Sequence, residues 1–269
     1  MIEFDSVGKD FPGGTRAVED FSLLVPTGSI TVLVGSSGCG KTTLLRMVNR
    51  MVDPTRGEVR IDGTSIAVRD PVELRRSIGY VMQSGGLLPH KTVSENIQTV
   101  AKLRGVPKES REAAVTELMQ TVGLDPSLRE RYPAQLSGGQ QQRVGVARAL
   151  AIDPNILLMD EPFGAVDPLV RADLQRELLE LQKKLAKTVM FVTHDIDEAF
   201  LLGDNVAILE EGGRIVQHGT PQEILASPAN DFVSAFVGVD RGKRALRLVE
   251  ENGHRIALDG DGRPVGRLV

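Results

Sequence analysis

Residues 30–42 read ITVLVGSSGCGKT, and this stretch decides the fold. Residues 30–34 form a short, β-branched run typical of a strand buried on both faces of a parallel sheet. Gly35 to Thr42 fit the pattern G-x-x-x-x-G-K-[ST], and a helix is predicted from Lys41 to Arg50. In this setting the loop N–H groups surround a phosphate at a helix N-terminus, Lys41 reaches the β- and γ-phosphates, and Thr42 offers its hydroxyl to Mg²⁺. The sequence therefore predicts a phosphate-binding loop.

The rest of the chain alternates strands with helices. Buried strands are also predicted at 156–159 and 189–192, and a helix at 171–187 begins after Asp167-Pro168, a favourable cap. This order predicts an α/β fold: a P-loop NTPase core with a mostly parallel sheet and flanking helices. Residues 2–4, 17–25 and 58–61 predict an N-terminal antiparallel β subdomain. Residues 87–133, with a helix at 108–122, predict an all-helical insertion.

Composition excludes several classes of protein. The 269 residues are 41% apolar and 25% charged, which is ordinary for a globular chain. The net charge of -4, from 32 basic and 36 acidic residues, lacks the basic excess of a nucleic-acid-binding protein. The apolar runs are too short to cross a bilayer, and the acidic N-terminus does not resemble a secretory signal, so we expect a cytoplasmic location. The single cysteine, Cys39, excludes an internal disulfide.

Two further stretches carry chemistry. The strand at 156–159 ends in Asp160 and Glu161, at the sheet edge where α/β proteins bind their ligands. Asp160 suits a Mg²⁺ shell, and Glu161 is placed to polarise an attacking water. Residues 136–140 read LSGGQ and open a helix, for which Ser137 is a good N-cap. From the residues alone, LSGGQ is equally well an ordinary capped helix start.

The three stretches at 35–42, 136–140 and 156–161, in this order and at these separations, resemble the nucleotide-binding subunit of ATP-binding cassette (ABC) transporters. The resemblance covers about residues 1–240. It implies ATP hydrolysis with Mg²⁺ by a homodimer that sandwiches ATP, in which Ser137 and Gly139 of one copy face the γ-phosphate held by Lys41 of the other. It further implies that Gln83 contacts Mg²⁺ or water and that His194 contacts the γ-phosphate.

The resemblance extends the set of predicted site residues. It places Asp167 in the loop that acts across the dimer, Phe11 on the adenine, and Val18 in an apolar contact with the base. The predicted catalytic residues are Glu161, His194, Gln83 and Lys41, and the predicted metal ligands are Thr42, Gln83 and Asp160. The predicted nucleotide-binding residues are Phe11, Val18, Gly35, Ser36, Ser37, Gly38, Cys39, Gly40, Lys41, Thr42, Thr43, Gln83, Ser137, Gly138, Gly139, Gln140 and Asp167.

Residues 49–50, 70–81 and 213–221 resemble one subfamily, the importers of compatible solutes such as glycine betaine, choline, carnitine or proline. None of these stretches touches the solute, so the solute is inferred by likeness alone. The alternatives are an importer ATPase for an amino acid or polyamine, and a soluble ABC ATPase outside transport. The subfamily implies that integral-membrane permease subunits bind this chain at the cytoplasmic face of the membrane. An extracytoplasmic substrate-binding protein would be an indirect partner, and no nucleic-acid partner is expected.

The last segment, 241–269, is too short to be a domain. Residues 256–265 predict a hairpin with an Asp/Gly turn at 259–262. Residues 258–266 resemble the strand–turn–strand of a CBS module, but a complete module would need about 100 further residues. We therefore interpret the tail as a possible CBS-module remnant or the start of a truncated one.

Overall fold

A six-stranded sheet forms the centre of the computed structural model, which describes residues 1–83, 86–164, 166–239, 246–251, 254–258 and 263–267. The strand order is β10-β9-β3-β8-β7-β6, with β10 antiparallel to β9 and the other five strands parallel. The strands span β3 (Ile30–Gly35), β6 (Gly79–Val81), β7 (Ile156–Asp160), β8 (Thr188–Thr193), β9 (Asn205–Leu209) and β10 (Ile215–Gly219). The predicted α/β core is confirmed.

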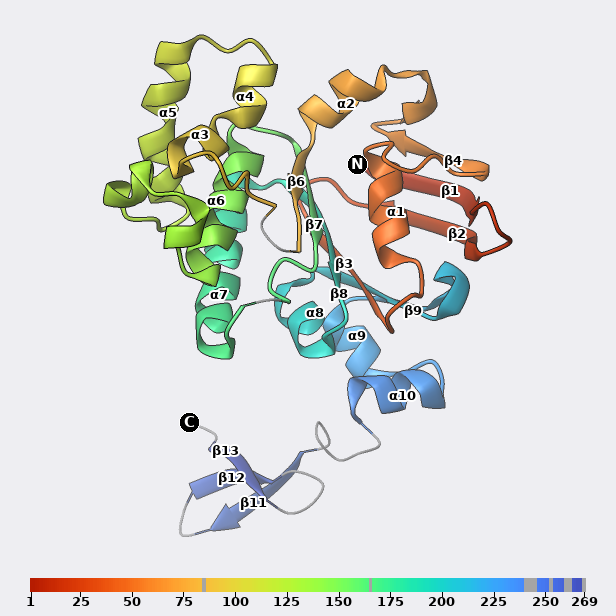
Figure 1. Ribbon diagram of the computed structural model, residues 1–269. Coiled ribbons are helices and arrows are strands. Elements are labelled where there is room, and N and C mark those ends of the chain that lie inside the picture. Colours follow the sequence, from red (N-terminus) through yellow and green to blue (C-terminus); the bar gives the residue numbers. More distant parts are fainter. Residues whose placement is uncertain (84–85, 165, 240–245, 252–253, 259–262, 268–269) are drawn as a thin grey trace.

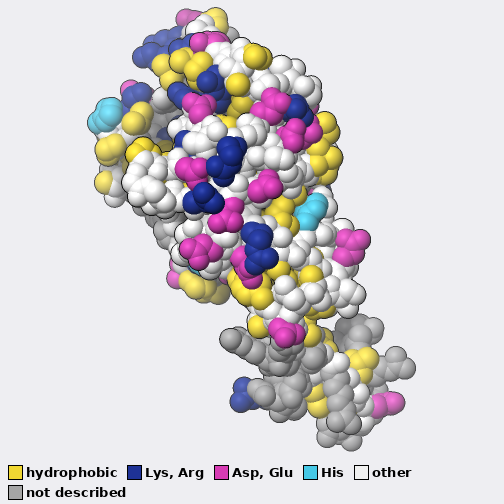
Figure 2. All heavy atoms as spheres, turned by 90° about the vertical axis from the view of Figure 1, so that its right-hand side faces the viewer, with side chains coloured by type: hydrophobic (Ala, Val, Ile, Leu, Met, Phe, Trp, Pro, Cys, Tyr) yellow, Lys and Arg dark blue, Asp and Glu magenta, His cyan; other side chains and the backbone are white. Residues whose placement is uncertain are grey.

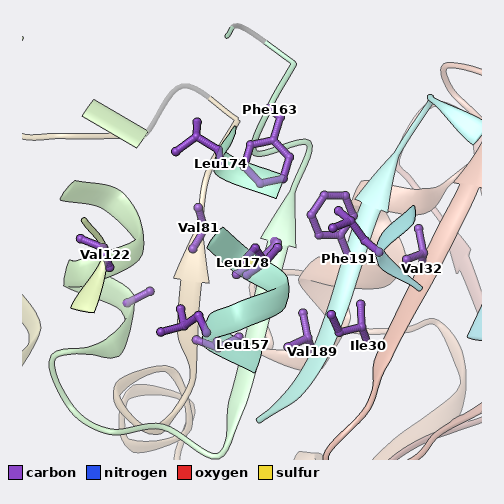
Figure 3. Close-up of a cluster of buried hydrophobic side chains, with 14 of the residues drawn as sticks. Ile30, Val32, Val81, Val122, Leu157, Phe163, Leu174, Leu178, Val189 and Phe191 are labelled. Atoms are coloured by element: carbon purple, nitrogen blue, oxygen red, sulfur yellow. The ribbon is translucent and has the colours of Figure 1, made fainter. Parts of the chain in front are cut away.

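The apolar runs in the sequence form the buried central strands of this sheet. Every residue of β3, β7 and β8 is buried, as expected of parallel strands covered by helices on both faces. Figure 3 shows side chains from these strands packed together, including Val32, Leu157 and Phe191. The rings of Phe163 and Phe191 lie 5.9 Å apart, centroid to centroid. This core fixes the strand ends that carry the candidate site.

The predicted antiparallel subdomain is a four-stranded sheet in the order β2-β1-β4-β5. It comprises β1 (Ile2–Asp10), β2 (Arg16–Val25), β4 (Arg56–Ile61) and β5 (Thr64–Ser65). β1 runs well past the predicted 2–4. Register shifts after Phe4 break the alternation of apolar and polar residues, so the sequence pattern of a strand stops before the strand itself does. Phe4 and Phe21 hold the sheet together through an edge-to-face contact at 5.2 Å. On the face shown in Figure 2, basic and acidic side chains are interspersed.

Helices cover the sheet and extend to one side of it. Figure 1 shows α3, α4 and α5 grouped beside α6, opposite the N-terminal sheet. These are α3 (Val93–Ile97), α4 (Thr99–Leu103), α5 (Lys108–Thr121), and the 3-10 helices η2 (Pro126–Glu130) and η3 (Pro133–Gln135). The helical character predicted for 87–133 is therefore confirmed. The predicted helices that flank the site are α1 (Lys41–Val48), α6 (Gly138–Leu150) and α7 (Pro168–Leu185).

Several elements have no counterpart in the sequence prediction. They are η1 (Ile66–Val68), α2 (Pro71–Ser77), α8 (Ile196–Leu202), η4 (Glu211–Gly213), α9 (Pro221–Ala226) and α10 (Asp231–Val237), together with β6, β9 and β10. Each has seven residues or fewer, which is too short for a helical or strand period to stand out.

The tail forms a separate three-stranded antiparallel sheet of β11 (Arg247–Glu251), β12 (His254–Leu258) and β13 (Pro264–Arg267). β12 and β13 pair through Ala257 and Gly266, in agreement with the predicted hairpin. β11 was not predicted, and the predicted turn at 259–262 lies outside the described residues. Figure 1 shows this sheet set apart from the rest of the chain.

A buried carboxyl between α7 and α8 makes stability depend on pH. Glu198 is 5% exposed, and Gln175 Nε2 donates to its Oε1 at 2.9 Å. Burial, as the largest cause, raises the pKa of Glu198 above 4.5 in the folded chain. The folded state therefore holds this proton to higher pH than the unfolded state does, and stability is lost as pH rises from 4.5 through the raised value.

We expect Glu198→Gln, which keeps the acceptor for Gln175, to be more stable than the wild type at pH 7 and about equally stable well below pH 4.5. Urea unfolding of both chains across this pH range measures the difference. Glu109→Gln on α5 serves as the control, because it makes the same change from carboxyl to amide at an exposed position. A stability difference that does not vary with pH would contradict the assignment.

Candidate functional site

The phosphate-binding loop connects β3 to α1, and its shape requires glycine at two positions. A Cβ on Gly35 would lie 2.3 Å from the carbonyl oxygen of Leu209, closer than any side chain tolerates. Gly40 has φ +104, and a Cβ there would lie 2.6 Å from the Ala17 carbonyl oxygen. Between them, residues 36–38 are exposed to solvent. The loop therefore presents backbone to the outside while its ends pack against the sheet.

Lys41 is drawn into this loop. The residue is 4% exposed, and its Nζ donates to the carbonyl oxygens of Gly35 and Ser36, each at 2.8 Å. The ammonium is thus a buried cation held by backbone dipoles at the start of α1. A phosphate anion here would meet both this charge and the positive end of the helix. Cys39, 1% exposed, contacts the same ammonium at 3.7 Å through its Sγ.

The predicted metal ligands Thr42 and Asp160 lie together although 118 positions separate them. Thr42 Oγ1 donates to Asp160 Oδ1 at 2.8 Å, at the C-terminal end of β7. A hydroxyl and a carboxylate side by side are the hard oxygen donors that Mg²⁺ prefers. The geometry therefore fits a Mg²⁺ ion beside the phosphate loop, with these two residues holding it.

Two residues that sequence analysis missed complete the surroundings of Asp160. Tyr80 O–H donates to Asp160 Oδ2 at 3.0 Å, and an Arg46 guanidinium nitrogen lies 3.7 Å from the same oxygen. Burial, followed by the charge of Asp160, raises the pKa of Tyr80 to about 12. The phenol is therefore a protonated donor at neutral pH. Only the i,i+4 spacing of Thr42 and Arg46 on α1 could have suggested Arg46 from the sequence.

Glu161, Gln83 and His194 form a second cluster next to the first. Gln83 Nε2 donates to Glu161 Oε2 at 3.3 Å, and His194 Nδ1 lies 3.0 Å from the same oxygen. Gly164 borders the cluster: a Cβ there would lie 3.5 Å from Gln83 Nε2. Glu161 has φ 44, a left-handed conformation that a non-glycine residue adopts only when its surroundings hold it. The structure thus brings together Glu161, Gln83 and His194, three of the four residues that were predicted to be catalytic.

The LSGGQ residues lie at the start of α6 and cap it. Ser137 Oγ accepts from Gln140 N at 3.3 Å, and Gln140 Oε1 accepts from Ser137 N at 2.9 Å. A Cβ on Gly139 would lie 2.5 Å from Val170, so this glycine lets α6 approach α7. Within the part of the chain that the structure describes, no hydrogen bond joins residues 137–140 to the phosphate loop.

The remaining predicted residues have different settings. Asp167 caps α7, accepting from Leu169 N at 3.0 Å. Phe11 is 37% exposed, with the Lys9 ammonium 5.2 Å from its ring centroid. Val18 is 0% exposed and packs behind Gly40, and its contact with a base stays a prediction.

The fold and these motifs define a class of protein. The family model described as "ABC transporter" matches residues 18–164, and the chain belongs to this family. Among solved structures it is similar to a dimeric post-hydrolysis ATP-binding cassette bound to ADP and Pi (TM-score 0.74, 33% identity, 82% of this chain and 99% of that one). It is also similar to cbiO1 from Clostridium perfringens, part of the ABC transporter complex cbiONQ (TM-score 0.77, 29% identity, 88% and 94%).

Named relatives share about half of its residues. The glycine betaine/carnitine/choline transport ATP-binding protein OpuCA of Bacillus subtilis is 51% identical over 90% of this chain and 63% of its own length. The osmoprotectant import ATP-binding protein OsmV of Salmonella typhimurium is 50% identical over 93% and 66%. The glycine betaine uptake system ATP-binding protein YehX of Escherichia coli is 49% identical over 93% and 80%. The chain thus spans less than two thirds of the length of OpuCA and OsmV.

Among the residues that the structure describes, none of the helices combines the length and apolar character needed to span a bilayer.

Proposed function

We propose that this chain is the ATP-hydrolysing subunit of an ABC importer that takes up a compatible solute such as glycine betaine, choline, carnitine or proline. The observation that carries the ATPase part is the convergence of Gln83 and His194 on the carboxylate of Glu161, next to the Thr42–Asp160 pair. The solute part rests on the relatives, which are named as transport proteins for glycine betaine, carnitine or choline.

The hydrolytic step divides among these residues. The loop N–H groups and Lys41 bind the phosphates, and Thr42 and Asp160 would hold a Mg²⁺ ion, which would supply charge neutralisation for the phosphates. Glu161 accepts a proton from the attacking water, and Gln83 and His194 fix the orientation of its carboxylate. Phe11, exposed at the edge of the N-terminal sheet, stacks on adenine.

A complete site needs two copies of the chain. Ser137 is exposed at the N-terminus of α6, with Gly139 buried just behind it, and the Ser137 side chain bonds only to its own helix start within the described residues. A γ-phosphate held by Lys41 of a second copy is a suitable partner for this helix end, where Ser137 and Gly139 lie. Asp167 would lie at the same junction. A homodimer with two sandwiched nucleotides follows, and the dimeric cassette among the structural relatives supports it.

The helical region supplies the contact with the membrane partner. We propose residues 87–133 as the part that docks on integral-membrane permease subunits at the cytoplasmic face, with 87–89 as the lip of that contact. An extracytoplasmic substrate-binding protein would act only through the permease. We further propose residues 1–240 as the ATPase domain and 241–269 as a segment related to a CBS module.

Transport in a reconstituted system tests the proposal. Proteoliposomes that contain this chain with its cognate permease, the cognate binding protein and Mg·ATP should accumulate labelled glycine betaine, with competition by choline, carnitine or proline. The Glu161→Gln chain is the control for uptake without hydrolysis. Uptake of amino acids or polyamines alone would favour the alternative importer class. A rate of ATP hydrolysis that does not change when a permease is added would favour a soluble ATPase.

A further inference from the structure

The carboxylate of Asp160 is engaged at both oxygens by groups from two other elements. Oδ1 accepts from Thr42 on α1, and Oδ2 accepts from Tyr80 on β6 with Arg46 at 3.7 Å. Asp160 itself is 7% exposed. Its orientation is therefore set by its neighbours rather than by solvent.

Of the two groups on Oδ2, Tyr80 is the more firmly placed. β6 pairs in parallel with β7, and Tyr80 lies opposite Leu158, which precedes Asp160 by two residues. This backbone pairing in the sheet anchors Tyr80 near Asp160. The Tyr80 ring packs against the buried cluster beneath α1. The Arg46 side chain is 49% exposed and makes the longer contact. Residues that bond to a metal ligand from behind fix its direction and commonly tune metal affinity.

We propose that Tyr80 is a positioning residue of the magnesium site: its O–H holds Oδ2 of Asp160, which keeps Oδ1 directed at the metal position beside Thr42. The inference rests on the proposed function, because it requires Mg·ATP at the phosphate loop. Tyr80 touches neither nucleotide nor metal in this arrangement and acts only through Asp160.

Tyr80→Phe removes the hydroxyl and keeps the ring. We expect its affinity for ATP in EDTA to stay within about twofold of the wild type, while the affinity of the ATP-loaded chain for Mg²⁺ falls about 10-fold or more. Titration with a fluorescent ATP analogue, and then with Mg²⁺, measures the two affinities separately. Tyr132→Phe, at a tyrosine that is 46% exposed, is the matched control and should change neither.

The chain itself offers a second readout. It contains two tyrosines and no tryptophan, so a Tyr132→Phe chain has Tyr80 as its sole emitter at tyrosine wavelengths. Mg²⁺ added to this chain at constant ATP should change the Tyr80 emission, because the carboxylate bonded to the phenol gains a cation. The same addition to the Tyr80→Phe chain, which keeps only Tyr132, should leave the emission unchanged.

The outcomes separate the two proposals. A wild-type chain that binds no Mg·ATP would overturn the proposed function and this inference with it. A normal wild type together with an unaltered Mg²⁺ affinity in Tyr80→Phe would overturn the inference alone. An equal loss of ATP affinity with and without Mg²⁺ would also overturn it, by making Tyr80 a packing residue.

Discussion

Replacing Glu161 by Gln is expected to lower the rate of ATP hydrolysis by about 10²–10⁴-fold, equivalent to ~3–5 kcal/mol of barrier. The amide keeps the size of the side chain and its place beside Gln83 and His194, but it cannot accept a proton from water. The phosphate loop is untouched, so ATP affinity should stay close to that of the wild type. Phosphate release at saturating Mg·ATP and a separate ATP-binding titration measure the two effects.

The same variant should accumulate as a dimer in Mg·ATP, because the sandwich forms but does not hydrolyse its nucleotide. Light scattering after size-exclusion chromatography, with and without Mg·ATP, detects the change in mass. Glu109→Gln, at an exposed position of α5, is the matched control and should turn over normally without a trapped dimer. Unchanged turnover in Glu161→Gln would remove this carboxylate from the mechanism.

Replacing Lys41 by Ala is expected to reduce ATP affinity by about 10²-fold or more. Two unit charges ~4 Å apart interact by about 4 kcal/mol at an effective dielectric of 20, and the substitution removes that attraction from the phosphate site. The loop should still form, since its shape depends on Gly35 and Gly40 rather than on the lysine. Calorimetric titration with Mg·ATP measures the affinity, and urea unfolding of the nucleotide-free chain checks the fold.

Lys184→Ala on α7 controls for the loss of a lysine, because its side chain is exposed. It should bind ATP as the wild type does. An affinity of Lys41→Ala within threefold of the wild type would show that backbone N–H groups alone bind the phosphates. A large loss of stability without nucleotide would instead mean that the bonds from Lys41 to the loop carbonyls hold the loop together.

The buried centre of the fold was predictable from local sequence. Residues 30–34, 156–159 and 189–192 are continuous apolar runs because their strands are covered on both faces, and all three are buried strands. Asp167-Pro168 marked the start of α7 because a cap is a local interaction. By contrast, β6 has three residues and β9 five, so their existence depends on neighbours far along the chain.

The candidate site shows the same division. The phosphate loop and the acidic strand end carry local patterns, whereas Gln83 and His194 were found only through family resemblance, since a single Gln or His has no period or spacing. Tyr80 escaped prediction because its partner lies 80 positions away. The burial of Val18 behind Gly40 was also beyond local prediction, because an apolar residue in a strand can face either a ligand or the core.

The close approach of α6 and α7 at Gly139 has a mechanical consequence. With Val170 filling the space that a larger side chain would need, the first turns of α6 and α7 pack directly against each other, and we expect a shift of one to displace the other. If Ser137 contacts one nucleotide of the proposed homodimer and Asp167 borders the other, a displacement at either nucleotide site would reach the other site without passing through the central sheet. In the proposed homodimer, the two nucleotide sites would then be coupled rather than independent.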